Sequence, residues 1–465
     1  MARSTRSSNS STHAKVEPVE EKEIKTWGSG GLFASRDLGA LLLLVLCPLF
    51  GMLVWYIVVE QKGSLRGFYI AVFHKRLGMG WWNFLKKELW VKAYPFRPRA
   101  MKIVGCYAAF EAFLQLYVPG KKFKATPTAT GHIPVYKANG VACYLISIVA
   151  LFALKYFRIF NPAIVYDEFG SMLMFMNLFA LLFCLFLTIK GLNFPSTKDS
   201  GSNGSLIMDY FWGTELYPRI FGLDVKEFTN CRFGMMYWQI GILCYAFKQY
   251  DLYGYVSSSM AVSIAIQTAY IYKFYLWETG YFCSMDIQHD RAGYYICYGC
   301  LAYLPIVYTM HTLYLTEHPI LLSEEWAFLI AAAGIFSVWC NYDCDRQRQE
   351  FRATHGKAKV WGKTPTFITA EYTTEDGQER TSLLLTSGWW GLSRHIHYIP
   401  EILASVFWCI PVQKTHMIAY FYPFYLTLLL LDRAWRDDAR CADKYKQYWA
   451  EYCEIVPYKI IPGVV

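Results

Sequence analysis

The chain has 465 residues, of which 55% are hydrophobic and 18% aromatic, and only 17% carry a charged side chain. Soluble domains average about 25% charged residues, so the composition argues against an ordinary water-soluble protein. The formal net charge is +9, but no basic tract or nucleic-acid-reading motif accompanies it. Nucleic acid is therefore not an expected partner, and the charge fits basic cytoplasmic loops and an anionic ligand.

The chain begins with a polar, serine-rich stretch, residues 1–37, which lacks the apolar core of a signal peptide. We expect a disordered tail and targeting by the first spanning helix. Apolar runs follow at 40–59, 101–118, 139–157, 170–189, 233–247, 256–277, 294–315, 325–342, 399–411 and 416–431. A spanning helix needs about 20 mostly apolar residues. The sequence thus predicts an all-α polytopic membrane protein with nine or ten transmembrane helices.

Two connecting segments have patterns of their own. Residues 80–98 mix tryptophan, phenylalanine and lysine, as a helix lying in the membrane interface does. The stretch 343–386 is the one sizeable polar insertion, and within it FITAEYTTEDGQERTSLLL alternates on both sides of Asp376-Gly377. That pattern predicts a small cytosolic β-hairpin.

Basic residues gather in the last third of the chain. Arg348 and Arg352 are four positions apart, and Arg433, Arg436 and Arg440 are three and four apart, so each set shares a helix face. Arginine binds phosphate with a forked geometry, and these arginines indicate a phosphate pocket. The alternative is the general excess of basic residues at cytoplasmic helix ends, and spacing alone does not separate the two.

A metal centre is not expected. His395, His397 and Glu401 form a possible ligand set, but the other histidines are dispersed, too few to complete a di-iron centre. Cys297 and Cys300 form a CxxC pair inside a predicted span, with no second pair at zinc-site spacing. Hydrogen bonding to a cofactor is the better interpretation of the histidines.

Acidic residues near span ends are candidates for catalysis, because an ionisable group at membrane depth is functional by default. They are Glu215, Glu278, Asp286, Asp290, Asp437 and Asp438. The chain has no GxGxxG or GxxxxGK[ST] motif, so a dinucleotide would bind without a Rossmann unit.

Long motifs in this chain resemble the sterol reductase family of the endoplasmic reticulum, which includes sterol C14-, C24(28)- and Δ7-reductases and the lamin B receptor. The resemblance covers nearly the whole chain after the tail. It is carried by GTELYPRI at 213–220, LLLTSGWWGLSRHIHYIPEI at 383–402 and the ending DRAWRDDARCADKYKQYWAEYCEIVPYKIIPG at 432–463. Many members have Asn at the positions of Tyr217 and His397 and Gly-Asp at Pro400-Glu401, which leaves a changed role open for His397 and Glu401.

Within the family, WETGYFCSMDIQHDRAGYY at 277–295, WGKTP at 361–365 and the hairpin resemble the Δ7-reductase branch in its plant-type form. That resemblance implies NADPH-dependent reduction of the C7–C8 double bond of Δ5,7-sterols in sterol biosynthesis. It also implies a C-terminal cofactor pocket open to the cytosol. The residues expected to hold NADPH are Arg348, Arg352, Trp361, Trp390, Arg394, His395, His397, Tyr398, Arg433, Arg436, Lys444 and Tyr445.

The sterol double bond is not polarised by a carbonyl, so protonation must precede hydride transfer. We expect the acid among Asp437, Asp438, Glu401 and Tyr281, with the first two favoured. Glu215, Trp277 and Asp286 are the expected sterol-binding residues. Aromatic side chains around the site would stabilise the cation, by about 0.5–2 kcal/mol for each ring.

The resemblance also implies a multi-pass protein of the endoplasmic reticulum membrane. Its sterol comes from the bilayer, its surroundings are membrane lipids, and a complex with other sterol-synthesis enzymes is possible. We expect three parts: the tail at 1–37, an N-terminal membrane half at 38–230 and a reductase core at 231–465. Alternatives are a sterol C14-reductase, a sterol-binding or scaffold protein without turnover, and a methyltransferase related to the isoprenylcysteine enzymes. A transporter is the weakest alternative, since the chain shows no inverted repeat.

Overall fold

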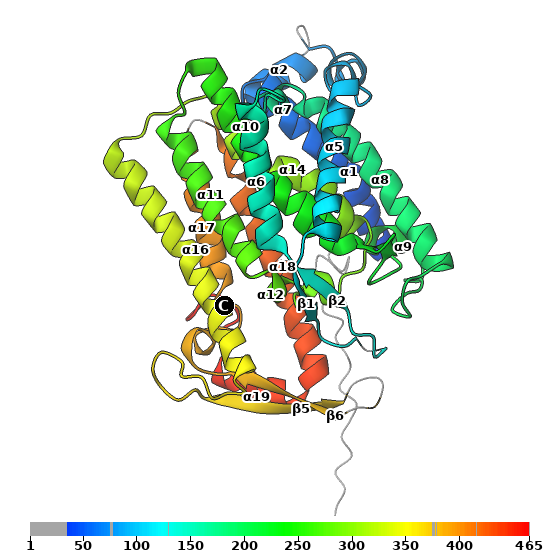
Figure 1. The fold of residues 1–465 in the computed structure, drawn as a ribbon, viewed down its shortest axis with the longest axis vertical. Helices are drawn as coiled ribbons and strands as arrows, with labels where there is room; N and C mark the ends of the chain where they lie inside the picture. The colour runs from blue at the N-terminus through cyan, green and yellow to red at the C-terminus, as the bar shows by residue number, and fades with distance from the viewer. Residues whose placement is uncertain are drawn as a thin grey trace, which may run out of the picture.

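A computed structural model describes residues 35–74, 78–128, 130–373, 377, 379–414 and 416–464. The predicted tail lies outside these residues except for 35–37, where the first helix begins. The fold is a bundle of long helices, drawn in Figure 1, with its small sheets near one end of the bundle.

Every apolar run that predicts a span is helical. The long helices are α1 Arg36–Trp55 (continued by the π-helical turn η1 Tyr56–Glu60), α5 Pro98–Tyr117, α6 Gly140–Tyr156, α8 Phe169–Asn193, α10 Met236–Tyr253, α11 Ser258–Leu276, η4 Tyr294–Tyr303 with α14 Leu304–Val307 and α15 Met310–Glu317, α16 Glu324–Ala353, α17 Tyr398–Cys409 and α18 Phe421–Tyr445. In the described chain, four stretches are long and apolar enough to cross a membrane: Arg36–Glu60, Phe169–Asn193, Tyr294–Glu317 and Glu324–Ala353. The helical membrane architecture agrees with the prediction, and the number of about ten spans stays a prediction.

Shorter elements connect these helices. They are α2 Leu65–Phe73, α3 Trp81–Asn83, η2 Phe84–Leu89, α4 Trp90–Lys92, α7 Ile164–Asp167, α9 Leu206–Trp212, η3 Glu227–Met235, α12 Glu278–Tyr281, α13 Met285–Gln288, η5 Gly388–Gly391, η6 Ile410–Val412, η7 Met417–Tyr420 and α19 Gln447–Ile455. The consecutive turns α3, η2 and α4 make the predicted interfacial segment helical, and Trp82 on it is 73% exposed.

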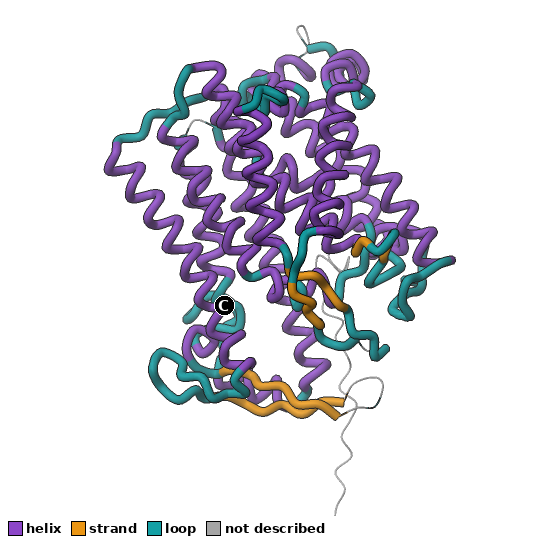
Figure 2. Tube along the Cα trace, in the orientation of Figure 1, coloured by secondary structure: helices purple, strands orange, loops and turns teal. Residues whose placement is uncertain are grey.

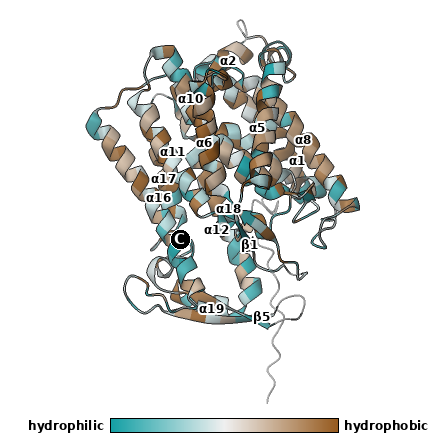
Figure 3. Cartoon of the chain, in the orientation of Figure 1, coloured by the Kyte–Doolittle hydropathy of each residue, from teal (hydrophilic) through white to brown (hydrophobic). Residues whose placement is uncertain are grey.

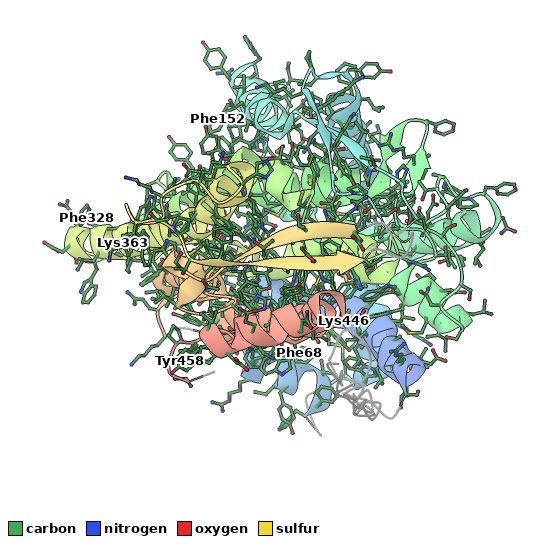
Figure 4. All side chains as sticks on the ribbon, turned by 90° about the horizontal axis from the view of Figure 1, so that it is seen from below. Phe68, Phe152, Phe328, Lys363, Lys446 and Tyr458 are labelled. Atoms are coloured by element: carbon green, nitrogen blue, oxygen red, sulfur yellow. The ribbon has the colours of Figure 1, made fainter. Side chains whose placement is uncertain are left out.

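Apolar side chains cover the outside of the bundle as well as its core. Figure 3 shows hydrophobic colour along the bundle and hydrophilic colour at the lower ends of α16 and α18. Leu182, Phe328 and Val149 are exposed on their helices, at 67%, 71% and 66%, and Phe328 and Phe152 point outward at the rim in Figure 4. An apolar outer surface of this kind is expected where lipid replaces water.

Two π-helical stretches, η3 and η4, lie side by side in the middle of the bundle. The Thr229 hydroxyl lies 3.9 Å from the Cys297 sulfur, and a Cβ atom at Gly234 would lie 3.1 Å from the carbonyl oxygen of Cys300. The close approach therefore depends on the absence of a side chain at Gly234. Cys297 and Cys300 are free thiols in η4.

The strands form three antiparallel pairs, coloured orange in Figure 2. They are β1 Lys121–Lys124 with β2 Val135–Ala138, β3 Arg219–Ile220 with β4 Leu223–Asp224, and β5 Phe367–Thr373 with β6 Glu379–Leu385. The β5–β6 pair confirms the predicted hairpin, with Phe367 opposite Leu385 and Thr373 opposite Glu379. Asp376, half of the predicted turn, lies outside the described residues.

The hairpin closes the polar end of the bundle together with α19. Ile368 and Ala370 of β5 are buried while their neighbours Phe367, Thr369 and Glu371 are exposed, the alternation expected of a half-buried strand. The buried residues pack against Trp449 and Tyr452 of α19. Figure 4 shows the hairpin and α19 side by side at this end, with Lys446 and Tyr458 at opposite ends of α19.

Candidate active site

The turn Gly388–Gly391 is pinned to the polar end of α16. The Trp390 indole donates to the Cys344 carbonyl at 2.9 Å, and the Trp389 indole donates to the Asp343 carboxylate at 2.8 Å. The turn lies so close to α16 that a Cβ atom at Gly388 (φ +66°) would lie 2.3 Å from the Gln347 side-chain oxygen. Glycine is needed there for both the left-handed backbone and the close approach.

This turn places an aromatic face under an arginine. The Arg348 guanidinium lies 4.0 Å from the centre of the Trp390 ring and 3.3 Å from the Asp345 carboxylate. Stacking on one face leaves the planar guanidinium edge available to an anion. Arg352, one turn further along α16, is exposed, and Trp361 is 56% exposed with its ring 5.3 Å from that of Trp389.

The two histidines and Tyr398 form a ring cluster beside Trp390. The His395 and Tyr398 rings stack at 5.0 Å and 11°, and the His397 ring lies 4.4 Å from Tyr398 and 5.1 Å from Trp390. Within the described residues, His395 Nε2 and His397 Nδ1 are buried without a hydrogen-bond partner. Buried polar atoms are normally satisfied, so these nitrogens point to a bound polar group.

Burial decides the charge state of His395. Removal of its imidazole from water lowers its pKa from 6.5 to about 4, against the opposing effect of Asp437 and Asp438. His395 is therefore neutral at physiological pH, and one ring nitrogen is an acceptor and the other a donor.

A later segment of the chain, residues 456–460, backs the histidine cluster. The amides of Arg394 and His395 donate to the carbonyls of Tyr458 and Lys459 at 3.0 and 2.8 Å. The Arg394 guanidinium donates to the Val456 carbonyl at 2.9 Å. Arg394 is thus engaged mainly with main-chain oxygen, and its contribution is to hold this segment in place.

Two arginines of α18 face α13 and the turn that follows it. Arg433 Nη2 lies 3.0 Å from Asp286 Oδ2, and Arg436 Nη1 lies 3.4 Å from Asp290 Oδ1. Arg436 also donates to the Tyr295 hydroxyl at 3.1 Å. Arg440, which the sequence puts on the same helix face, pairs with Asp437 of its own helix at 2.8 Å, and its part in a phosphate pocket stays a prediction.

Asp437 and Asp438, the predicted acids, are both ion-paired. Asp437 lies beside Arg440 and 4.0 Å from His395, and Asp438 lies 2.9 Å from Lys459 and 3.5 Å from Arg394. Burial opposes ionisation of Asp437, but Arg440 and the neighbouring cations outweigh it and lower its pKa. A carboxyl held ionised is a poor proton donor at neutral pH.

Glu401 has a different environment. It accepts a hydrogen bond from the Tyr270 hydroxyl, and it forms no ion pair with another described residue. The Tyr270 ring packs against Trp238 and Trp408 at 5.5 and 5.4 Å. The carboxyl–phenol pair therefore stands at the wall of an aromatic cluster, one turn along α17 from Tyr398.

Three other predicted site residues form hydrogen bonds or ion pairs with groups outside the histidine cluster, although the Trp277 ring lies 5.5 Å from the Lys273 ammonium. The Glu215 carboxylate binds Lys190 at 2.8 Å and the Ser196 amide at 2.5 Å, and it is 2% exposed. The Tyr281 hydroxyl accepts a hydrogen bond from Asn230 at 2.8 Å, and the Trp277 indole donates to Gln349 at 2.9 Å.

Lys444 and Tyr445 are engaged with the hairpin. The Lys444 ammonium lies 4.2 Å from the Tyr372 ring, and the Tyr445 hydroxyl donates to Ser382 at 3.3 Å. These contacts dock the end of α18 on β5–β6, at the edge of the cluster.

The prediction missed a polar group at the centre of the site. Lys273 of α11 lies 2.5 Å from the Asn341 side-chain oxygen and 3.5 Å from the Asp345 carboxylate, and Asn341 donates to the His397 carbonyl at 2.9 Å. A lysine inside the apolar run 256–277 was the available signal, because charges at that depth are rare. Tyr270, on the same run, carried no signal, since tyrosine is frequent throughout the chain. Among the described residues, no group of three or more His, Cys, Asp or Glu side chains is placed to hold a metal ion.

A comparison with known proteins identifies the family of this chain. Residues 37–465 match the model of the ergosterol biosynthesis ERG4/ERG24 family, and the chain belongs to this family of sterol reductases.

Relatives of this chain carry two kinds of name. A 7-dehydrocholesterol reductase of Arabidopsis thaliana is 50% identical over 425 residues, 91% of this chain and 96% of the relative. A 7-dehydrocholesterol reductase of Danio rerio is 34% identical, over 81% of this chain and 82% of the relative. A Delta(14)-sterol reductase of Methylotuvimicrobium alcaliphilum is also 34% identical, over 79% and 84%.

Proposed function

We propose that this protein reduces the C7–C8 double bond of Δ5,7-sterols of the 7-dehydrocholesterol type to give Δ5-sterols, with NADPH as the reductant. The observation that carries the proposal is the 50% identity to a plant 7-dehydrocholesterol reductase across 91% of the chain. Its place would be the endoplasmic reticulum membrane, with the sterol entering from the bilayer. Residues 231–465, which contain all the arginines discussed above, would form the reductase core.

The residues at the polar end of the bundle fit a dinucleotide phosphate. Arg348 over Trp390 offers a stacking face and a cation, Arg433 and Arg436 offer two further guanidinium groups, and the unsatisfied nitrogens of His395 and His397 offer hydrogen bonds. When bound, NADPH supplies the hydride. Arginine forks bind phosphate well, so Arg348, Arg433 and Arg436 are the residues that would hold its phosphates.

The chemistry requires a proton before the hydride. Protonation at C8 of a Δ5,7 diene gives an allyl cation spread over C5 to C7, and hydride addition at C7 leaves the Δ5 double bond. An isolated alkene gains no such delocalisation, so conjugated dienes are the preferred substrates. The enclosing side chains must exclude water, which would otherwise capture the cation.

We assign the proton to the Tyr270–Glu401 pair rather than to Asp437 or Asp438. Glu401 is free of an ion pair among the described residues, whereas both aspartates are held by cations. The neighbouring rings of Trp238 and Trp408 would stabilise the cation, by about 0.5–2 kcal/mol each. Tyr281 is a less suitable donor, because its oxygen is engaged with Asn230.

Asp286, expected from the sequence to bind the sterol, is ion-paired with Arg433 at 3.0 Å, and we assign it to the phosphate-binding arginines instead. Glu215 and Trp277 would act on the sterol indirectly, through the segments that they fix.

Expression of the chain in microsomes that lack sterol reductases tests the function. 7-Dehydrocholesterol and NADPH are added, the loss of the conjugated-diene absorbance is followed, and the products are identified by mass spectrometry. Conversion to a Δ5-sterol is the expected result. Reduction of a Δ8,14-sterol alone would instead favour the second candidate function, that of a Δ14-reductase. This candidate is supported by the 34% identity to a Delta(14)-sterol reductase.

A further inference from the structure

Lys226 is a fully buried lysine just before η3. Its ammonium group donates to the main-chain carbonyls of Asp286, Ile287 and Asp290 at 3.0, 2.7 and 2.6 Å. An ammonium has three protons to donate, and these three carbonyls use all of them. The side chain therefore anchors one short stretch of backbone, which we name the 286–290 segment.

The 286–290 segment needs such an anchor. Its helix α13 has only four residues, so its last carbonyls have no partner within the helix. A cation at a helix C-terminus also interacts favourably with the carbonyl dipoles. Burial disfavours the charged form and lowers the pKa of Lys226 to about 8, while Asp290 and Asp224 act in the opposite direction. At neutral pH the ammonium form is the main one.

The side chains of the same segment face α18. Asp286 binds Arg433 at 3.0 Å, and Asp290 lies 3.4 Å from Arg436, which also binds Asp432 of its own helix at 2.9 Å. Asp290 is fully buried. Because its side chain has no room to move independently, the carboxylate is displaced whenever its backbone is displaced. Lys226 thus fixes the main chain on one side of the 286–290 segment, and the carboxylates on the other side orient two guanidinium groups of the site.

We propose that Lys226 is a positioning residue for the cofactor: by anchoring the 286–290 segment, it holds Arg433 and Arg436 in the orientation that binds the phosphates of NADPH. The inference rests on the proposed function. Lys226 itself bonds to main-chain oxygens, so its effect on the cofactor passes through Asp286 and Asp290.

Substitution Lys226→Met keeps the length and apolar stem of the side chain and removes the three donors. The expected result is an increase of about tenfold in the KM for NADPH, as for a loss of about 1.4 kcal/mol in binding. The KM for the sterol and kcat at saturating NADPH should stay within about twofold, because the reacting groups are untouched. A merely structural defect would lower the amount of active enzyme and leave both KM values unchanged.

Lys92→Met is the matched control. Lys92 lies 2.6 Å from Glu60, the last residue of η1, and 3.3 Å from Glu88 of η2, so this variant also removes one positive charge and its ion pairs, but on a partly exposed side chain away from the site. Its KM for NADPH should equal that of the wild type. Lys226→Gln, whose amide donates two hydrogen bonds, should give a smaller increase than Lys226→Met, and it serves if the methionine variant does not fold.

A double variant that combines Lys226→Met with Asp286→Asn tests whether Lys226 acts on the cofactor through Asp286. If Lys226 acts through Asp286, the increase in the double variant is smaller than the product of the two single increases. An unchanged KM for NADPH in Lys226→Met and Lys226→Gln, in an enzyme whose wild type reduces the diene, would overturn this inference alone. A wild type that neither binds NADPH nor reduces a sterol would overturn the proposed function and this inference together.

Discussion

Replacement of Glu401 by glutamine separates the candidate proton donors. The glutamine side chain has nearly the same shape, and its carbonyl oxygen can still accept the hydrogen bond that Tyr270 donates to Glu401. What it lacks is a carboxyl proton. We therefore expect a folded protein with normal affinity for NADPH and a large loss in kcat.

The expected loss in kcat differs between Glu401, the proposed proton donor, and Asp437, which is ion-paired. General acid catalysis contributes about 10²–10⁴ in rate, so kcat of Glu401→Gln should fall by that factor, or about 3–5 kcal/mol in activation free energy. Asp437→Asn removes an ion pair with Arg440, which is 43% exposed, and such pairs are worth about 0.2–1 kcal/mol. Its kcat should fall by less than about tenfold.

The assay is single-turnover loss of the diene absorbance at saturating NADPH, with Tyr270→Phe measured beside the two variants. Tyr270→Phe should reduce kcat as well, because it removes the phenol that shares the hydrogen bond with Glu401. The reasoning is refuted if Glu401→Gln keeps the wild-type rate while Asp437→Asn loses it.

Three further outcomes are expected. Arg348→Met should raise the KM for NADPH by about tenfold or more, from the loss of a charge-assisted contact, and leave the sterol KM unchanged; steady-state kinetics with each substrate varied decides this. Because the pKa of His395 is lowered to about 4 by burial, the unfolded chain takes up a proton near pH 6.5 before the folded protein does. Stability is then present above pH 6.5 and lost as the pH falls toward 4, by up to about 3 kcal/mol, and the melting temperature of His395→Gln should depend less on pH in that interval. Gly170→Ala should destabilise the protein by about 1–3 kcal/mol, because its Cβ atom would lie 2.1 Å from the Trp55 ring, whereas Gly105→Ala, with no atom within 4 Å, should not; thermal melting in detergent compares them, and equal melting temperatures would contradict the account.

Hydropathy predicted the helices because a single apolar segment such as 170–189 can form all its backbone hydrogen bonds within itself in lipid only as an α-helix. The hairpin was predictable for a similar local reason, since its alternation continues across the turn. The π-helical stretches η3 and η4 were not, because widening a helix over nine or ten residues leaves no clear mark in the spacing of apolar residues. Their geometry depends on the neighbour against which each packs.

The sequence predicted which kinds of residue make up the candidate site, but not which residue each of them contacts. Arginines at the polar ends of spans stand out in the sequence, but which carboxylate each one meets depends on segments far apart, such as Arg436 and Asp290 at 146 positions. The structure shows Asp437 engaged with Arg440, three positions along the same helix, at 2.8 Å. Lys226 was missed because a lysine in a polar stretch is usually solvated.

The main-chain pairing of Arg394 and His395 with Tyr458 and Lys459 has a consequence for biosynthesis. The histidine segment leaves the ribosome about 60 residues before the stretch that backs it, and the main-chain bonds between them are 2.8 and 3.0 Å in the finished protein. Every long helix precedes that stretch in the chain, since α18 ends at Tyr445. A chain interrupted between residues 446 and 457 would therefore keep every long helix and lack the carbonyl groups that accept from the Arg394 and His395 amides. We expect the membrane bundle of such a chain to form without a complete site at the histidine cluster.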